Sequence, residues 1–259
     1  DYAKMKEKER NKKNRRHYIQ FLMQALTAQQ KFQHLNILKI YEVQSAAKKL
    51  GFASEEIETS LAKEKEFSRD ELIYIAQQLA STMRHVHDIL HLAFMGICPE
   101  NIFLNSHFTL KLGLFIHTAP FLQELAQISD PFIPWSPYSI FHIPATFSAP
   151  EVISGGTITS RSDVYMYALL CIFIFTGQKP TTSESVVKVD ETTPFELLQS
   201  VPDEFASLLR NCLNHDPSSR PNFDQITSAD TFSSIVSNIF QYIENIRDKD
   251  LKDMYTFFV

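Results

Sequence analysis

The chain has 259 residues, of which 44% are hydrophobic and 21% charged, a composition typical of a folded globular protein. Its formal net charge of -5 excludes nucleic-acid binding driven by bulk charge. Its 6 glycines form neither G-x-G-x-x-G nor G-x-x-x-x-G-K-[ST], so both common backbone cradles for phosphate are absent from the sequence. Its 3 cysteines contain no C-x-x-C pair, which argues against a secreted disulfide framework.

The first segment, residues 1–16, is strongly basic and predicts a solvated helical extension. Its charge also suits weak contact with an anionic membrane, whereas no nucleic acid is expected as a partner. The start has no apolar signal-peptide core, and the longest apolar run, Tyr165 to Phe175, is too short to span a bilayer. We therefore expect a cytoplasmic location. The candidate membrane-contacting side chains are Lys4, Lys6, Lys8, Lys12, Lys13, Arg15 and Arg16.

The next elements are predicted from helix formers, β-rich runs and a capping pattern. A long helix starts after residue 5 and includes 17–33, a segment without Gly or Pro. Two short strands follow at 35–43 and 49–54. Ser68 and Glu71 have the spacing of a capping box, which predicts a helix from there to near His87.

The second half of the chain is predicted to be mostly helical. Asp163 to Phe175 is apolar all round, which indicates a buried helix that stops at Gly177. Before it, two short strands are expected at 101–104 and 109–112, followed by a long proline-rich irregular segment at 116–148. After it, we expect a polar connection at 181–194 and three helices at 203–213, 223–228 and 231–249.

Five stretches in a fixed order carry a resemblance to a known family. They are PENIFL (99–104), LKLGLF (110–115), SAPE (148–151), SDVYMYALL (162–170) and CLNHDPSSRP (212–221). Together they resemble the C-terminal lobe of the protein kinase superfamily, in which the catalytic loop, metal-binding turn, A-P-E, αF aspartate and D-P-x-x-R-P follow in this order. The resemblance implies an α+β, mainly α-helical, protein-kinase-like fold, chiefly the helical C-terminal lobe with a truncated or incomplete N-terminal lobe.

The same resemblance divides the chain into four parts. Residues 1–16 form the basic extension, and 17–66 form a remnant of the kinase N-lobe with its αC helix, two strands and hinge. Residues 67–230 form the kinase-like C-lobe. Residues 231–259 form a helical extension that leads towards a HEAT-repeat region.

The catalytic loop of a kinase reads H-R-D-L-K-P-E-N, and the same window here reads FMGICPEN. The His and Arg positions hold Phe94 and Met95. The Asp that accepts the substrate's proton falls at Gly96, and the Lys that steadies the transferred phosphate falls at Cys98. Asn101 is retained, and we interpret it as a cap of the loop rather than a metal ligand.

The positions that hold metal and nucleotide are also altered. The D-F-G turn aligns with Leu114, Phe115 and Ile116, and a leucine offers Mg²⁺ no oxygen ligand. Leu114 and Ile116 are instead expected to fill the former metal site. The glutamate of the αC helix falls at Ala25. No metal or other cofactor is therefore expected.

The architectural residues of the family are present. Glu151 and Arg220 match its buried ion pair, which ties the activation segment to the helical lobe. Asp163 matches the αF aspartate that anchors the catalytic-loop backbone. Phe94 and Phe115 are apolar where the family stacks a His and a Phe into an internal spine.

The altered loop, the intact P-E-N-I, the proline-rich segment and the C-terminal tail resemble the SCY-like pseudokinases, most closely their clathrin-associated branch. This implies an inactive scaffold that holds clathrin or its adaptors at Golgi or endosomal membranes. Two alternatives stay open. The chain could act as an allosteric partner of another enzyme, or as an atypical Ser/Thr kinase that recruits Asp88, Asp130 or Asp190.

Overall fold

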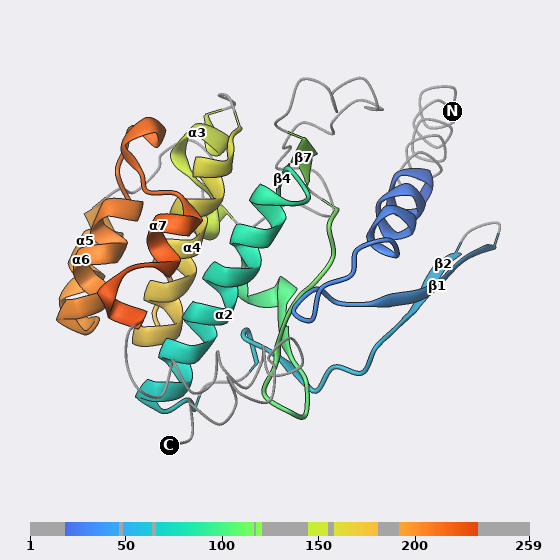
Figure 1. Cartoon of the computed structure of the whole chain (residues 1–259), viewed down its shortest axis with the longest axis horizontal. Coiled ribbons are helices and arrows are strands. Elements are labelled where there is room, and N and C mark those ends of the chain that lie inside the picture. The colour runs from blue at the N-terminus through green and yellow to red at the C-terminus, as the bar shows by residue number, and fades with distance from the viewer. Residues whose placement is uncertain are drawn as a thin grey trace, which may run out of the picture.

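The computed structural model of the chain groups helices α2 to α7 on one side (Figure 1). A helix at residues 19–29 and a two-stranded ribbon lie on the other side, with short strands between the two groups. The predicted α+β, mainly helical fold is confirmed. The structure describes residues 19–46, 49–63, 66–116, 118–120, 145–154, 158–180 and 192–232.

Two long helices form the core of the helical side. Helix α2 (Arg69–Asp88) packs against α4 (Ser160–Thr176) and against the short α7 (Phe223–Thr227). At the start of α2 the Glu71 N–H donates to Ser68 Oγ at 3.3 Å, and the Ser68 N–H donates to the Glu71 carboxylate at 2.7 Å. The predicted capping box is thus present, and it satisfies two N–H groups that the helix itself cannot pair.

Helix α4 contains the longest run of buried residues in the described chain. Every residue in 162–172 is buried, as its apolar composition predicts. Gly177 ends the helix with φ of 68°, a left-handed conformation that glycine adopts without strain. α6 (Asp203–Cys212) and α5 (Thr192–Leu197) pack on α4. A short helix, α3 (Pro150–Ile153), precedes it.

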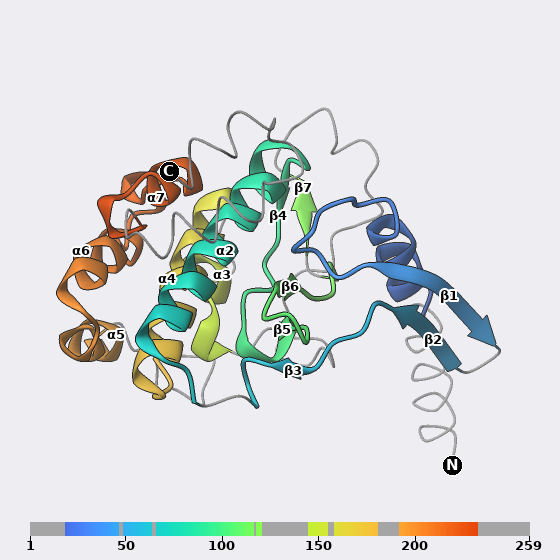
Figure 2. The same ribbon diagram turned by 60° about the horizontal axis from the view of Figure 1, so that its bottom comes forward.

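Among the residues that the structure describes, the strands form three small antiparallel sheets (Figure 2). One contains β3, β5 and β6 in that order, one pairs β4 with β7, and one pairs β1 with β2. Their bounds are β1 (Ile40–Ala46), β2 (Lys49–Ser54), β3 (Thr59–Ser60), β4 (Leu92–Ala93), β5 (Ile102–Leu104), β6 (Leu110–Leu112) and β7 (Ala119–Pro120).

The β5–β6 hairpin brings two sequence motifs together. The side chain of Asn105 accepts the N–H groups of His107 and Thr109 and thereby forms the turn. Asn101 precedes β5, Gly113 follows β6, and the Gly113 N–H donates to the Asn101 carbonyl at 2.8 Å. The hairpin therefore places the catalytic-loop motif beside the metal-turn motif.

The β1–β2 ribbon packs on the N-terminal helix through a small apolar cluster. Leu26, Leu38 and Ile40 are buried in it. The strand predicted at 35–43 begins only at Ile40, so that prediction was wrong at its start. The preceding backbone turns and forms a single parallel bridge between Ile37 and Leu112 instead of a ladder.

Two further predictions differ from the structure or fall outside it. Helix α5 lies partly within the connection predicted at 181–194, where threonines and a proline gave no helix signal. Proline is tolerated there because it stands in the first turn. The extension at 1–16, residues 121–144 of the long segment and residues 233–259 lie outside the described residues.

Candidate functional site

The candidate site forms where the loop before β5 meets the turn after β6. Asp163, fully buried on α4, accepts the N–H groups of Phe94 and Met95, each at 2.7 Å. Its carboxylate also lies 2.9 Å from His87 Nε2. Met95 has φ of 54°, a strained conformation for a residue with a side chain. The structure thus places Asp163 where it holds the strained loop.

An apolar stack lies beside this anchor. The rings of Phe94 and Phe115 are 4.6 Å apart between centroids, and both residues are buried. Phe32 contacts Phe115 edge-on at 5.1 Å. The two aromatic residues predicted to stack are therefore in contact, and the catalytic-loop and metal-turn motifs share one apolar core.

Gly96, which the motif alignment places at the family's catalytic aspartate, has no side chain that could accept a proton. A Cβ atom at this position would lie 2.8 Å from Asn101 Nδ2 and 3.0 Å from the Phe94 ring. Ordinary carbon contacts are longer, so a side chain here would displace one of these neighbours. The loop is packed around a glycine.

Asn101 uses its amide entirely on backbone groups. Nδ2 donates to the carbonyls of Gly96 at 3.1 Å and Leu114 at 3.2 Å. Oδ1 accepts the Leu114 N–H at 2.8 Å. Oδ1 could bind a metal only by giving up or sharing this hydrogen bond. Gly113 fits closely against it, because a Cβ there would meet the oxygens of Asn101.

The position that the motif alignment assigns to the metal-binding aspartate is apolar. Leu114 packs against the cluster of Leu26, Leu38 and Ile40, and Phe103 joins it there. Magnesium needs oxygen ligands, which these side chains do not supply. In the part of the chain that the structure describes, no group of three or more His, Cys, Asp or Glu residues could hold a metal ion. Ile116, the third residue of the turn, is half-buried.

Cys98 replaces the lysine that would steady a transferred phosphate. Burial, followed by the negative charge of Glu100, raises the pKa of the Cys98 thiol to about 12. The thiol is therefore neutral at physiological pH and is neither a cation nor an activated nucleophile. If Cys98 stands at the lysine position, as the motif alignment predicts, it supplies no positive charge there.

Ala25, which the motif alignment places at the αC glutamate position, is half-buried. One helical turn later, Gln29 makes the polar contacts between this helix and the turn after β6. Gln29 is 1% exposed. Its Nε2 donates to the carbonyls of Leu38 and Gly113, both at 2.9 Å, and its Oε1 accepts the Phe115 N–H at 3.0 Å. The sequence interpretation missed this residue. Its only signal is a glutamine one helical turn after Ala25 on the inner helix face.

Glu151 and Arg220 form the predicted ion pair. Arg220 donates to both Glu151 oxygens, at 2.7 and 3.0 Å, and its side chain is 0% exposed. Its guanidinium also lies over the Tyr165 ring at 4.8 Å. Burial alone would raise the pKa of Glu151, but hydrogen bonds from Arg220 and Ser162 outweigh it and lower that pKa. The pair is therefore charged at neutral pH.

Fold and site together define a protein-kinase-type domain with a helical lobe and a reduced sheet lobe. Residues 2–232 match the protein kinase domain family, and the chain belongs to that family. In the described chain no helix has the length and apolarity needed to cross a membrane.

Several known proteins are similar to the chain. The protein kinase-like protein SCY1 of Saccharomyces cerevisiae is 22% identical over 258 residues, which cover 88% of this chain and 32% of that protein. A probable serine/threonine-protein kinase of Dictyostelium discoideum is 26% identical over 174 residues, covering 63% and 10%. Ephrin type-A receptor 5 of Gallus gallus is 28% identical over 208 residues, covering 76% and 20%. The chain therefore spans at most a third of the length of these relatives.

Proposed function

We propose that this chain is a pseudokinase domain, which keeps the kinase fold and transfers no phosphate. The observation that carries the proposal is the arrangement around Asn101, whose amide bonds the backbone of Gly96 and Leu114. These are the positions of the catalytic and metal-binding aspartates. Phosphoryl transfer depends on positioning and charge neutralisation, so a site without either carboxylate lacks its main catalytic contributions.

The proposal extends to nucleotide binding. A triphosphate carries several negative charges, and removing them from water requires compensating cations or a metal. Ala25 stands where the motif alignment places the αC glutamate, so no carboxylate is present there to hold a nucleotide-binding lysine. Leu114 faces an apolar cluster where the metal would bind. Useful affinity for Mg·ATP is therefore not expected.

The cellular role that we propose is a scaffold in membrane traffic. The domain would hold coat components such as clathrin or its adaptors at Golgi or endosomal membranes. Support comes from the resemblance of the loop, proline-rich segment and tail to SCY-like pseudokinases, and from the similarity to yeast SCY1 along 88% of the chain. The basic residues of 1–16 would add about 1 kcal/mol each near an anionic membrane surface.

A thermal-shift titration of the full-length protein with ATP, with and without Mg²⁺, tests the nucleotide part. A ligand at 100 times its Kd would add about 2.7 kcal/mol of stability, which such an assay detects easily. We expect no shift at millimolar ATP. A magnesium-dependent shift, or phosphate transfer from radiolabelled ATP, would overturn the pseudokinase assignment.

Affinity purification with mass spectrometry tests the scaffold part separately. We expect coat proteins among the recovered partners and a Golgi or endosomal position for the tagged full-length protein. Recovery of one dominant enzyme would favour the allosteric alternative. A purely nuclear location would contradict a role in membrane traffic.

A further inference from the structure

Two shallow hollows adjoin on the helical side of the molecule, away from the altered catalytic loop. They meet at Asn211 near the end of α6, which lines both. Their volumes are about 360 and 330 Å³, at the lower end of the usual range for binding pockets. Because they share Asn211, one short peptide segment could occupy both.

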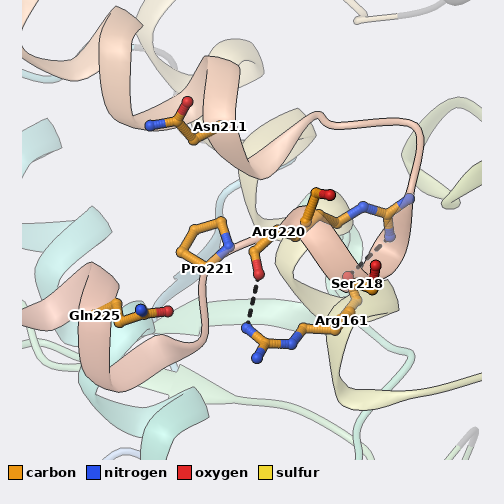
Figure 3. A pocket seen from close by; sticks show the side chains of 7 residues that line it. Arg161, Asn211, Ser218, Arg220, Pro221 and Gln225 are labelled. Carbon is orange, nitrogen blue, oxygen red and sulfur yellow. Dashed lines mark hydrogen bonds between the residues drawn. The ribbon is translucent and has the colours of Figure 1, made fainter.

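The first hollow presents hydrogen-bond donors (Figure 3). Arg161, in the first turn of α4, donates from Nη1 to the Arg220 carbonyl at 2.8 Å. The other N–H groups of Arg161, the Asn211 amide and Nε2 of Gln225 have no partner among the residues described. A guanidinium beside two amides complements a carboxylate, which accepts several such hydrogen bonds.

The second hollow combines an apolar wall with a cation. Phe195 of α5 is 39% exposed there, and Pro150, Tyr165 and Leu213 also line the hollow. Arg210, exposed on α6, makes no ion pair or hydrogen bond within the described chain. This arrangement suits a large apolar side chain with an acidic neighbour.

One nearby carboxylate limits the charge that the first hollow accepts. Asp216 is fully exposed, and its oxygens accept the Ser218 and Ser219 hydroxyls at 2.6 and 2.9 Å. Hydrogen bonds from Ser218 and Ser219 lower the pKa of Asp216, so it stays ionised at neutral pH. With one available arginine in the hollow and a fixed negative charge on Asp216, which bonds the lining residues Ser218 and Ser219, a singly charged carboxylate fits better than a phosphate.

We infer that these two hollows form a docking groove for an extended acidic peptide that carries one large apolar residue. The apolar residue would occupy the hollow beside Phe195. A neighbouring carboxylate would bind Arg161 and Asn211, and a further one would pair with Arg210. The groove uses no residue of the altered catalytic loop, so this inference goes beyond the proposed pseudokinase function and can fail without it.

Fluorescence anisotropy with a labelled Glu-Asp-Phe-Asp-Glu peptide tests the groove on the full chain. We expect saturable binding, which weakens at least about tenfold when the acidic residues become Gln and Asn, and likewise when Phe becomes Ala. Equal binding of the carboxamide peptide, or no saturable binding at millimolar peptide, would overturn the inference.

Three variants locate the contact. Arg210→Glu, Asn211→Asp and Phe195→Ser change exposed side chains, and each is expected to weaken binding at least about tenfold without changing the melting temperature. Lys63→Glu is the control, because Lys63 is exposed outside the groove and undergoes the same change of charge as Arg210. Equal losses in Lys63→Glu and Arg210→Glu would reveal attraction to net charge alone and contradict the groove.

Discussion

The helical side and the candidate site are held together by different kinds of side chain. On the helical side, the buried guanidinium of Arg220 pairs with Glu151, and the buried carboxyl group of Asp163 accepts N–H groups of the loop before β5. At the candidate site, the neutral amides of Gln29 and Asn101 hold the backbone. Amides need no counter-ion, whereas the charge of Arg220 is balanced by Glu151.

The largest loss of stability is expected when the buried ion pair of the helical side is broken. Arg220→Leu leaves Glu151 without its cation and should lower the free energy of unfolding by about 3–5 kcal/mol. Urea unfolding measures this. Arg69→Leu is the control, since Arg69 and Glu204 are 61% and 67% exposed and their pair is worth about 1 kcal/mol at most. A melting temperature of Arg220→Leu within about one degree of the wild type would contradict the role of the pair.

A smaller loss of stability is expected when an added side chain at Gly113 crowds Asn101. In Gly113→Ala the new Cβ would lie 2.5 Å from the backbone carbonyl of Asn101, which is fixed by its own hydrogen bond. We expect a loss of about 3 kcal/mol. Gly51→Ala provides the matched control, because nothing lies within 4 Å of the added Cβ. Similar unfolding midpoints for the two variants would show that the turn is not closely packed.

Removing a single amide sharpens the comparison further. Gln29→Leu leaves the Phe115 N–H and the carbonyls of Leu38 and Gly113 without their side-chain partner. The expected cost is about 2 kcal/mol, with faster hydrogen exchange at Phe115. Exposed Gln33→Leu in the turn after the same helix should change neither quantity. Unchanged exchange at Phe115 would mean that Gln29 does not hold the turn.

The smallest effect is a dependence on pH. Burial, then the charges of His85 and Lys111, lowers the pKa of His34 from 6.5 to about 4, and its Nδ1 accepts the Asn36 N–H at 3.0 Å. The folded state therefore favours neutral His34. Its contribution to stability is complete above about pH 6.5 and is lost as the pH falls towards 4. The difference in stability between pH 7 and pH 5, measured from unfolding curves, should be smaller in His34→Gln than in the wild type, and an equal difference would contradict this.

Local patterns in the sequence predicted the elements that local interactions form. Ser68 and Glu71 are three residues apart, so the start of α2 could be predicted from spacing alone. The role of Gln29 could not, because its partners Gly113 and Phe115 are more than 80 residues away. The motif order located Glu151 and Arg220. The start of the first strand was predicted wrongly because Ile37 forms only a single bridge, to Leu112 of the distant strand β6.

The close fit of Gly96 against Asn101 constrains how the sequence can change. A carboxylate could stand at position 96 only if Asn101 or the Phe94 ring moved, because both lie within 3.0 Å of the added Cβ. Asn101 in turn is held by the turn at Leu114. The effects of substitutions at positions 94, 96 and 101 on stability are therefore expected to depend on one another, so that a side chain at position 96 would need a compensating change at one of the other two.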